Sequence, residues 1–460
     1  MHAFLISTAA FIVLLGIMVV VHEFGHFAVA KLCGVRVEAF SVGFGPRLFG
    51  VKYGDTDYKV CLLPLGGYVK MTGETPDAGV TAGVEETDPA LVDDPGAFTA
   101  HPRWQRMLIG LAGPIANFIL AFVAMGCYFT WINESPAFEV ADTRVEWVTP
   151  GSQAALAGIQ AGDVIRQFAG SENPSWYMVD ARASLNLNES VPVDVDRDGR
   201  QLHLSLFLPS EPHGDEFDVS DIGLYPQQVS GPINVAAVVQ GAPAAQAGLQ
   251  PGDAIVSVDG HAFHTVPVLS AYLQAEKGQP ISVLVKRNGQ MLQPMEMHPT
   301  HSASAQLGSG WKLGFEAVPP PMHDQPLPFG RALAKSNTFC ADNSTLILDV
   351  LRGIFTHRVS ISQLTGPVGI ARMAGEAAEM KGWYPKFALA SEISLNLGIL
   401  NLMPFPILDG GLILLLVIES GIRRDINTLV KERIYQAAFV MLVAFAAFII
   451  FNDITKINAH

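Results

Sequence analysis

The chain has 460 residues, of which 49% are hydrophobic and 16% are charged, and its formal net charge is −14. A mean hydropathy of +0.30 with so few charges indicates an integral membrane protein with room for several domains. The acidic balance argues against a nucleic-acid partner, because phosphate binding needs clustered lysine and arginine. The four cysteines are too scattered to form a disulfide framework or a Cys-rich zinc module.

The first apolar run, Ala3–Ala30, contains the motif His22-Glu23-Phe24-Gly25-His26, whose three polar residues are its only ionisable groups. The run is too long for a cleaved signal peptide and lacks a basic start, so we expect a retained spanning helix. Ionisable residues at membrane depth are functional by default. On a helix this spacing puts two imidazoles on one face, where they can hold a metal while the glutamate handles the proton of a bound water. The alternative is that these residues only hydrogen-bond to neighbouring helices.

The next segment, residues 37–74, has short alternating stretches separated by glycine and proline, which predicts a membrane-associated β-hairpin region. Gly43 and Gly45 would permit the close approach of another backbone, so this region could hold an extended substrate by edge pairing. It could also merely shield the site. The acidic, Gly- and Pro-rich segment that follows, within residues 75–103, is expected to be a mobile inner loop.

Three more apolar runs are each about long enough to cross a bilayer, which takes about 20 helical residues. They are Met107–Phe129, Phe387–Ile418, which is interrupted by two prolines, and Tyr435–Phe451. Lysines and arginines cluster after the first run, before the second, and between the third and fourth. By the positive-inside rule, both termini and residues 132–386 lie outside and the two basic loops lie inside.

An internal repeat dominates the external part. Val148–Ile165 and Val238–Ile255 match at ten of 18 positions with an offset of 90 residues. Both repeats resemble circularly permuted bacterial PDZ domains, which add an extended peptide to a sheet edge and receive its carboxylate in a loop with a central glycine. The matching loops are Ile222-Gly223-Leu224 and Leu313-Gly314-Phe315. Alternatively these are ordinary strand glycines, and the two domains act as spacers or as a steric filter.

Two histidines do not complete a catalytic zinc site, which usually takes three protein ligands and keeps one position open. The candidates near membrane depth are Glu392, Asp409 and Glu419. Asp409 is favoured because it lies in a stretch broken by prolines and glycines, and broken helices at membrane depth line buried or wet cavities. Glu419 is more simply a solvated cap at the inner end of its span. Asp409 could itself be a helix N-cap.

His22-Glu23-Phe24-Gly25-His26, paired with Asn401–Gly411 on a late span, resembles the joint signature of the site-2 protease family of intramembrane zinc metalloproteases. Leu111–Asn117 also looks like that family, although we interpret Asn117 as a packing residue. The resemblance implies that His22, His26 and Asp409 hold one Zn²⁺ and that Glu23 is the general base. It also implies that Asn401 binds the substrate backbone or the developing oxyanion; a structural cap is the alternative.

The predicted fold is therefore an α-helical membrane protein with four transmembrane helices, a membrane-associated β-hairpin region and two tandem external PDZ-like α+β domains. The expected segments are a first span (1–36), the hairpin region (37–74), an inner loop (75–103), a second span (104–131), PDZ-like domains 1 (132–226) and 2 (227–318), an amphipathic helical connector (319–385), a broken third span (386–420), an inner loop (421–434) and a fourth span with a tail (435–460).

The resemblance implies a bacterial inner-membrane enzyme that cuts within single-span membrane proteins. Its substrates would be an anti-sigma factor already cut outside, in an envelope stress response, or remnant signal peptides. The active site would lie toward the cytoplasm and the PDZ-like pair in the periplasm, where it filters substrates. Two alternatives remain: a membrane-tethered PDZ scaffold with a vestigial metal site, and a metal transporter.

Overall fold

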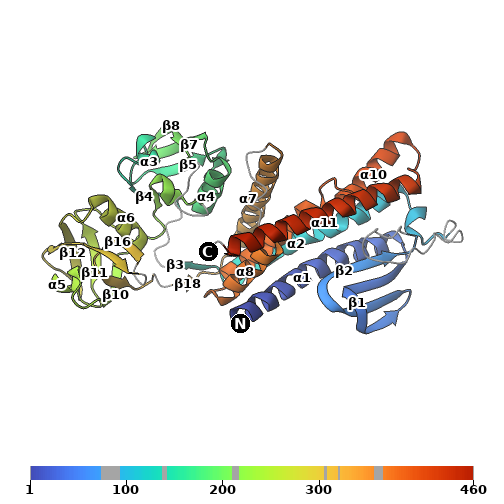
Figure 1. The fold of residues 1–460 in the computed structure, drawn as a ribbon, viewed down its shortest axis with the longest axis horizontal. Coiled ribbons are helices and arrows are strands. Elements are labelled where there is room, and N and C mark those ends of the chain that lie inside the picture. Colours follow the sequence, from blue (N-terminus) through green and yellow to red (C-terminus); the bar gives the residue numbers. More distant parts are fainter. Residues whose placement is uncertain are drawn as a thin grey trace. The chain divides into compact units, whose positions relative to one another are not determined.

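The computed structural model describes residues 2–73, 94–136, 142–209, 217–304, 308–319, 322–356 and 366–458. Most of the expected inner loop (75–103) lies outside these residues. The chain divides into two compact units (Figure 1). Unit 1 combines Met1–Asn133 with Pro326–His460, and unit 2 is Glu134–Gln325.

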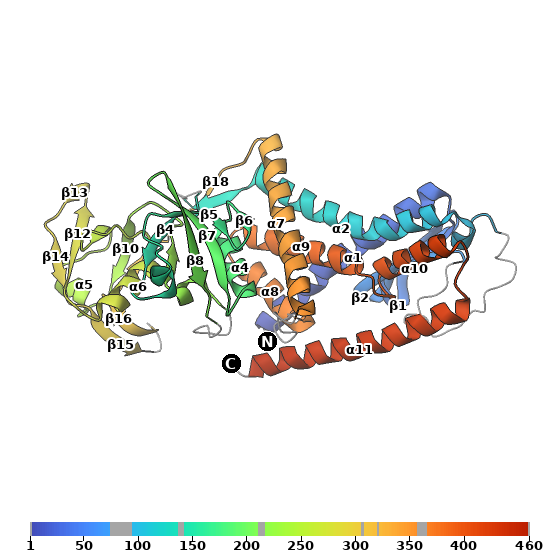
Figure 2. The same cartoon turned by 90° about the horizontal axis from the view of Figure 1, so that it is seen from above.

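Long apolar helices form the body of unit 1. Helices α1 (His2–Cys33) and α2 (Arg103–Trp131) lie side by side along much of their length (Figures 1 and 2). Within the described residues, three segments are long and apolar enough to cross a membrane: Ile6–Cys33, Arg103–Trp131 and Leu429–Phe451, the last within α11 (Thr428–Asn458). These correspond to the first, second and fourth expected spans.

The expected third span consists of two helices. Helix α9 (Tyr384–Asn401) has 18 residues and α10 (Asp409–Ile422) has 14. The interruption lies at Pro404 and Pro406, since proline lacks the backbone N–H that a helix interior needs. The helices α7 (Phe329–Phe355) and α8 (Pro367–Glu379) lie in the segment for which an amphipathic connector is expected.

Glu419 is not the solvated cap that the sequence suggested. Its side chain is fully buried and lies 2.6 Å from Lys431 Nζ, and its Oε1 accepts the backbone N–H of Ile426 at 2.9 Å. A buried carboxylate needs such a partner because desolvation is costly. Glu419 therefore ties α10 to the start of α11, and it lies outside the His–Asp cluster described below.

The hairpin region forms a two-stranded antiparallel sheet of β1 (Val37–Tyr53) and β2 (Thr56–Met71). The first part of β1 pairs with both halves of β2: Phe40 lies opposite Val69 on one side and Tyr58 on the other. Residues 67–71 therefore run along one margin of this curled sheet. A short 3₁₀ helix, η2 (Phe98–Ala100), precedes α2.

Unit 2 contains the two repeats, framed by the pairing of β3 (Glu134–Pro136) with β18 (Met322–Asp324). In the first repeat, one sheet has the order β6-β5-β7-β8 and β4 pairs with β9. Its elements are β4 (Val145–Val148), α3 (Gln153–Leu156), β5 (Val164–Phe168), β6 (Ser171–Glu172), α4 (Trp176–Leu185), β7 (Ser190–Arg197), β8 (Arg200–Phe207), η3 (Val219–Ile222) and β9 (Leu224–Pro226).

The second repeat has the strand order β13-β12-β11-β10-β17, with β14 also paired to β12 and a separate β15-β16 hairpin. Its elements are β10 (Ile233–Val238), α5 (Pro243–Gln246), β11 (Ala254–Val258), α6 (Val266–Glu276), β12 (Ile281–Arg287), β13 (Gln290–Met291), β14 (Met295–Met297), β15 (Thr300–Ser304), β16 (Gly308–Lys312) and β17 (Phe315–Ala317). Each repeat has its own hydrophobic core.

One ion pair occurs at the same place in both repeats. Asp163 and Asp253 follow the tight turn of each repeat, and each is fully buried. Arg197 reaches Asp163 at 2.7 Å and Arg287 reaches Asp253 at 2.6 Å. Each arginine also donates to the carbonyl oxygen of the glycine that ends the preceding helix. The repeat therefore extends to tertiary contacts that the motif itself does not contain.

Candidate metal centre

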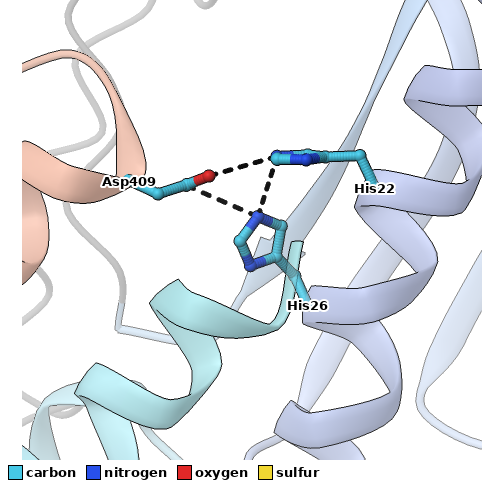
Figure 3. A group of neighbouring side chains, drawn as sticks. All are labelled: His22, His26 and Asp409. Carbon is cyan, nitrogen blue, oxygen red and sulfur yellow. Dashed lines mark hydrogen bonds and ion pairs between the residues drawn. The ribbon is translucent and has the colours of Figure 1, made fainter. Parts of the chain in front are cut away.

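His22, His26 and Asp409 come together in unit 1 (Figure 3). The two histidines lie one turn apart on α1, and Asp409 is the first residue of α10. His22 Nε2 lies 3.1 Å from Asp409 Oδ2 and 3.2 Å from His26 Nε2, and His26 Nε2 lies 3.4 Å from Asp409 Oδ1. Ligand atoms of a tetrahedral zinc site with bonds of about 2.0–2.1 Å lie roughly 3.3 Å apart. The three side chains therefore fit one metal ion.

Both imidazoles are oriented to offer Nε2 to that ion. His26 Nδ1 lies 2.7 Å from the carbonyl oxygen of Ile109, so its N–H donates there and Nε2 is left unprotonated. His22 Nδ1 lies 3.1 Å from the side-chain amide of Asn117, whose Oδ1 is buried with no hydrogen-bond partner among the described residues. Turning this amide by 180° places Oδ1 against the Nδ1–H of His22 and satisfies both groups. Asn117 then fixes the tautomer of His22.

Asp409 belongs to the cluster and does not cap α10. The N-cap residue is Leu408, and no side-chain capping bond is formed there. The carboxylate lies in the first turn of the helix, where the helix dipole favours negative charge. No donor among the described residues is in hydrogen-bond geometry with its buried Oδ2. A carboxylate oxygen that has no donor and lies beside two imidazole nitrogens can bind a cation.

Glycines allow the helices to meet at this point. A Cβ at Gly113 of α2 would clash with the imidazoles of both His22 and His26. Gly25, within the histidine motif, lies against the backbone of α2 at Ala112, where a Cβ would also clash. Gly410 has a comparable contact with the chain at Leu402, so the segment between α9 and α10 folds back tightly. These contacts explain why all three motifs contain glycine.

Glu23 lies beside the β1–β2 sheet. A Cβ on Gly67 of β2 would lie 3.3 Å from Glu23 Cγ, and the backbone of Val69 hydrogen-bonds to the Glu23 side chain. The margin of the sheet formed by residues 67–71 is therefore next to the motif. Asn401, the last residue of α9, also reaches the cluster, with Nδ2 3.3 Å from His22 Nε2.

Other residues predicted from the sequence do not contact the cluster in any described interaction. Gly43 and Gly45 have φ near +88° and +87°, and a Cβ at Gly43 would lie 2.6 Å from the carbonyl oxygen of Leu63. Within the described contacts, the need for glycine at Gly43 is thus explained by packing inside the sheet. Glu392, on α9, contributes no atom to the cluster.

The two predicted loops of unit 2 take similar conformations. Gly223 has φ +74° and Gly314 has φ +78°, and each lies directly before a short strand, β9 or β17. The Gly223 N–H donates to the Ser220 carbonyl oxygen at 2.9 Å. Ile222, Leu224 and Leu313 are buried in the cores and Phe315 is half-buried.

Sequence reasoning missed the contributions of Asn117, Gly113 and Gly67. Asn117 was assigned to packing, but it is fully buried and bonds to His22. A signal was present, because an amide within an apolar span needs a partner. Nothing local in the sequence points to Gly67, which reaches Glu23 only through the fold of β2.

Comparisons with known proteins identify the family of this chain. The family description Peptidase family M50 matches residues 10–445. The chain is 33% identical over 475 residues to the regulator of sigma-E protease RseP of Escherichia coli, covering 99% of this chain and 100% of that one. It is 32% identical over 466 residues to a Vibrio cholerae protein whose name describes a zinc metalloprotease, covering 97% and 98%.

Among solved structures, the chain is similar to the PDZ domain of an SdrC-like protein of Listeria monocytogenes. That likeness has 22% identity and a TM-score of 0.18, and it covers 20% of this chain and 93% of the other. The family match spans most of the chain and both relatives are aligned over nearly their whole length. The chain therefore belongs to Peptidase family M50, as an intramembrane zinc metalloprotease.

Proposed function

We propose that this peptidase hydrolyses peptide bonds within the transmembrane segments of single-span membrane proteins. Its substrates would be an anti-sigma factor already cut outside the membrane, in an envelope stress response, or remnant signal peptides. The relatives named as sigma-E regulators support this class of substrate. The observation that carries the proposal is the approach of Asp409 to His22 and His26 from the opposite end of the sequence.

In this proposal His22, His26 and Asp409 hold one Zn²⁺, and Asn117 positions His22. Bound zinc lowers the pKa of its water toward neutrality and polarises the carbonyl to be cut. Glu23 directly follows His22 on α1, so it would take the proton of the attacking water and give it to the leaving amine. Asn401 donates its amide N–H to the substrate carbonyl or the developing oxyanion.

A helical substrate hides its amides in internal hydrogen bonds, so it must unwind before it is cut. The margin of the β1–β2 sheet at residues 67–71 lies beside Glu23. We infer that this margin pairs with the unwound strand, as extended peptides pair with sheet edges elsewhere. A Cβ at Gly67 would clash with the carbonyl oxygen of Ser41 at 2.7 Å and would lie 3.3 Å from Glu23 Cγ, so glycine allows the strands to pair this close to Glu23. Gly43 and Gly45, which the sequence predicts to permit close approach of another backbone, stay candidates for contact with the substrate.

The proposed topology has four crossings of a bacterial inner membrane, with α9 and α10 together forming the third. Both termini and unit 2 lie in the periplasm, and the metal centre lies toward the cytoplasm, in accord with the basic residues near the span ends. We propose that unit 2 is a tandem of PDZ-like domains that filters substrates, with the loops at Gly223 and Gly314 as candidate carboxylate sites.

Cleavage of a single-span substrate by the purified chain tests this function. Glu23→Gln keeps the size and hydrogen bonding of the side chain but removes its basicity, so we expect bound zinc to stay and cleavage to fall by at least about 100-fold. The matched control is Glu392→Gln, which removes another carboxylate of the spans and should cleave normally. Wild-type cleavage by Glu23→Gln would contradict the role of Glu23. Absence of cleavage by the wild-type chain, with peptide binding by unit 2 intact, would favour the scaffold alternative.

A further inference from the structure

A cavity of about 550 Å³, partly open to solvent, lies in unit 2 between the two repeats. The first repeat contributes Asp218, Ser220 and Tyr225 to its wall, and the segment between β9 and β10 contributes Gln228. The second repeat contributes the N-terminal end of α6, from His264 to Val268, and the chain just after β17, from Ala317 to Pro319. The cavity therefore begins at the C-terminal end of β17, and the first repeat forms its opposite wall.

The free edge of β17 leads to this cavity. Among the described strands, β17 pairs only with β10 and is the last strand of its sheet. The Leu313-Gly314 loop lies at the start of β17, and its two carbonyl oxygens accept the N–H groups of Ala244 and Val239. A peptide added antiparallel to β17, with its carboxyl end at this loop, must leave past Ala317. At about 3.3 Å per residue, the three residues of β17 match the last three peptide residues.

The two walls of the cavity are held together by a joint between the repeats. Trp147 of β4 packs edge-on against Phe263 and Tyr272 of the second repeat, with ring centroids 5.9 and 5.2 Å away. Beside it, Glu146 Oε1 accepts the backbone N–H of His264 at 2.8 Å. A peptide that enters the cavity thus meets a preformed surface, which lowers the entropic cost of binding.

The residues that line the cavity indicate which kind of peptide it would bind. Valine, proline, isoleucine and alanine side chains supply most of the wall, Asp218 is its one carboxylate, and no lysine or arginine of the described chain lines it. Residues 134–325 carry 22 acidic and nine basic side chains, a net charge of −13. An apolar residue flanked by lysine or arginine complements such a site.

We propose that this cavity is an upstream subsite for an extended peptide with a free carboxyl end. The end lies at the Leu313–Phe315 loop of the second repeat. The fourth to sixth residues from the end occupy the cavity, where the first repeat reads them through Tyr225 and the acidic Asp218. The two repeats together therefore contact about six residues of the peptide, counted back from the carboxyl end that a cut creates. The inference rests on the proposed role of unit 2 as a peptide filter.

Fluorescence anisotropy on the full-length Glu23→Gln chain tests the subsite without requiring cleavage. The probes are labelled octapeptides ending in valine, with Lys-Leu-Lys or Asp-Leu-Asp at the fourth to sixth positions from the end, and a tripeptide with the same end. Burial of one leucine is worth about 1.5 kcal/mol, so we expect the Lys-Leu-Lys octapeptide to bind at least about tenfold more tightly than the tripeptide. It should also bind more tightly than the Asp-Leu-Asp octapeptide, whose acidic side chains face Asp218.

Gln228→Trp fills the cavity from the segment between β9 and β10 and should reduce the affinity of the Lys-Leu-Lys octapeptide to that of the tripeptide. Gln201→Trp, an exposed change on β8, should leave every affinity unchanged. Equal binding of the octapeptides and tripeptide, an equal loss for all probes in Gln228→Trp, or no binding of any probe would overturn the subsite. Cleavage of a single-span substrate by the wild-type chain, measured separately, shows whether the proposed function itself fails.

Discussion

A carboxylate of unit 1, Asp409, is buried in a different way from two carboxylates of unit 2. In unit 2, Asp163 and Asp253 are fully buried, and each faces an arginine of the same repeat. In unit 1, Asp409 faces two imidazoles, and its buried Oδ2 lacks a hydrogen-bond donor among the described residues. The protein itself neutralises the first kind of carboxylate, whereas the second is left for a cation. Burial of a carboxylate alone therefore does not mark a metal site; the two histidine nitrogens that converge on Asp409 do.

Gly113→Ala should have the largest effect, and only in unit 1. The new methyl group would clash with both imidazoles and displace their Nε2 atoms. Because a shift of about 1 Å in catalytic geometry costs about 100-fold in rate, we expect at least that loss of cleavage together with weaker zinc retention. The control is Gly126→Ala on the same helix, where the new methyl would lie 3.6 Å from Leu333, an ordinary contact. Equal activity of the two variants would show that the imidazoles tolerate displacement.

Arg287→Met should destabilise unit 2 and leave the metal centre of unit 1 unchanged. It leaves the fully buried Asp253 without its guanidinium, and a buried carboxylate that loses its partner destabilises the fold around it. Amide hydrogen exchange of β12 in the full chain should accelerate accordingly, while zinc content stays unchanged. Arg200→Met, at an exposed arginine, serves as the control. Unchanged exchange of β12 in Arg287→Met would mean that the arginine does not stabilise the repeat.

A smaller, pH-dependent effect is expected at the joint between the repeats. Burial raises the pKa of Glu146 to about 7, above its ordinary value of 4.5. A carboxyl whose folded pKa is raised adds stability below its unfolded pKa, and this is lost as the pH rises through the folded pKa. The hydrogen-bonding residue that faces Glu146 is His264, which contacts it through its backbone; His261 packs on the neighbouring Trp147.

Unit 2 should therefore melt at a lower temperature at pH 8 than at pH 6. Glu146→Gln cannot ionise, so it should reduce this difference. Differential scanning calorimetry of the full chain measures both. The same pH dependence in the variant would assign the effect to other groups.

Only part of the metal centre could be predicted from the sequence. The histidine motif and the broken stretch before Asp409 could be found because charge and proline are unusual inside an apolar run. The same stretch predicts where α9 ends, at Asn401, and where α10 begins, at Asp409. Asn117 and Gly67 could not be placed, because their roles depend on α2 and β2 packing against α1, contacts between residues far apart in the sequence. The arginine partners of Asp163 and Asp253 were missed for the same reason.

Zinc content and its coordination, measured by elemental analysis and X-ray absorption on the purified chain, test the metal centre most directly. We expect one zinc per chain with two imidazoles and one carboxylate as protein ligands. Asp409→Ala should lose the metal, and Asp253→Ala, which removes a buried carboxylate of unit 2, should keep it. Full zinc occupancy in Asp409→Ala would contradict the assignment of this carboxylate and the function built on it.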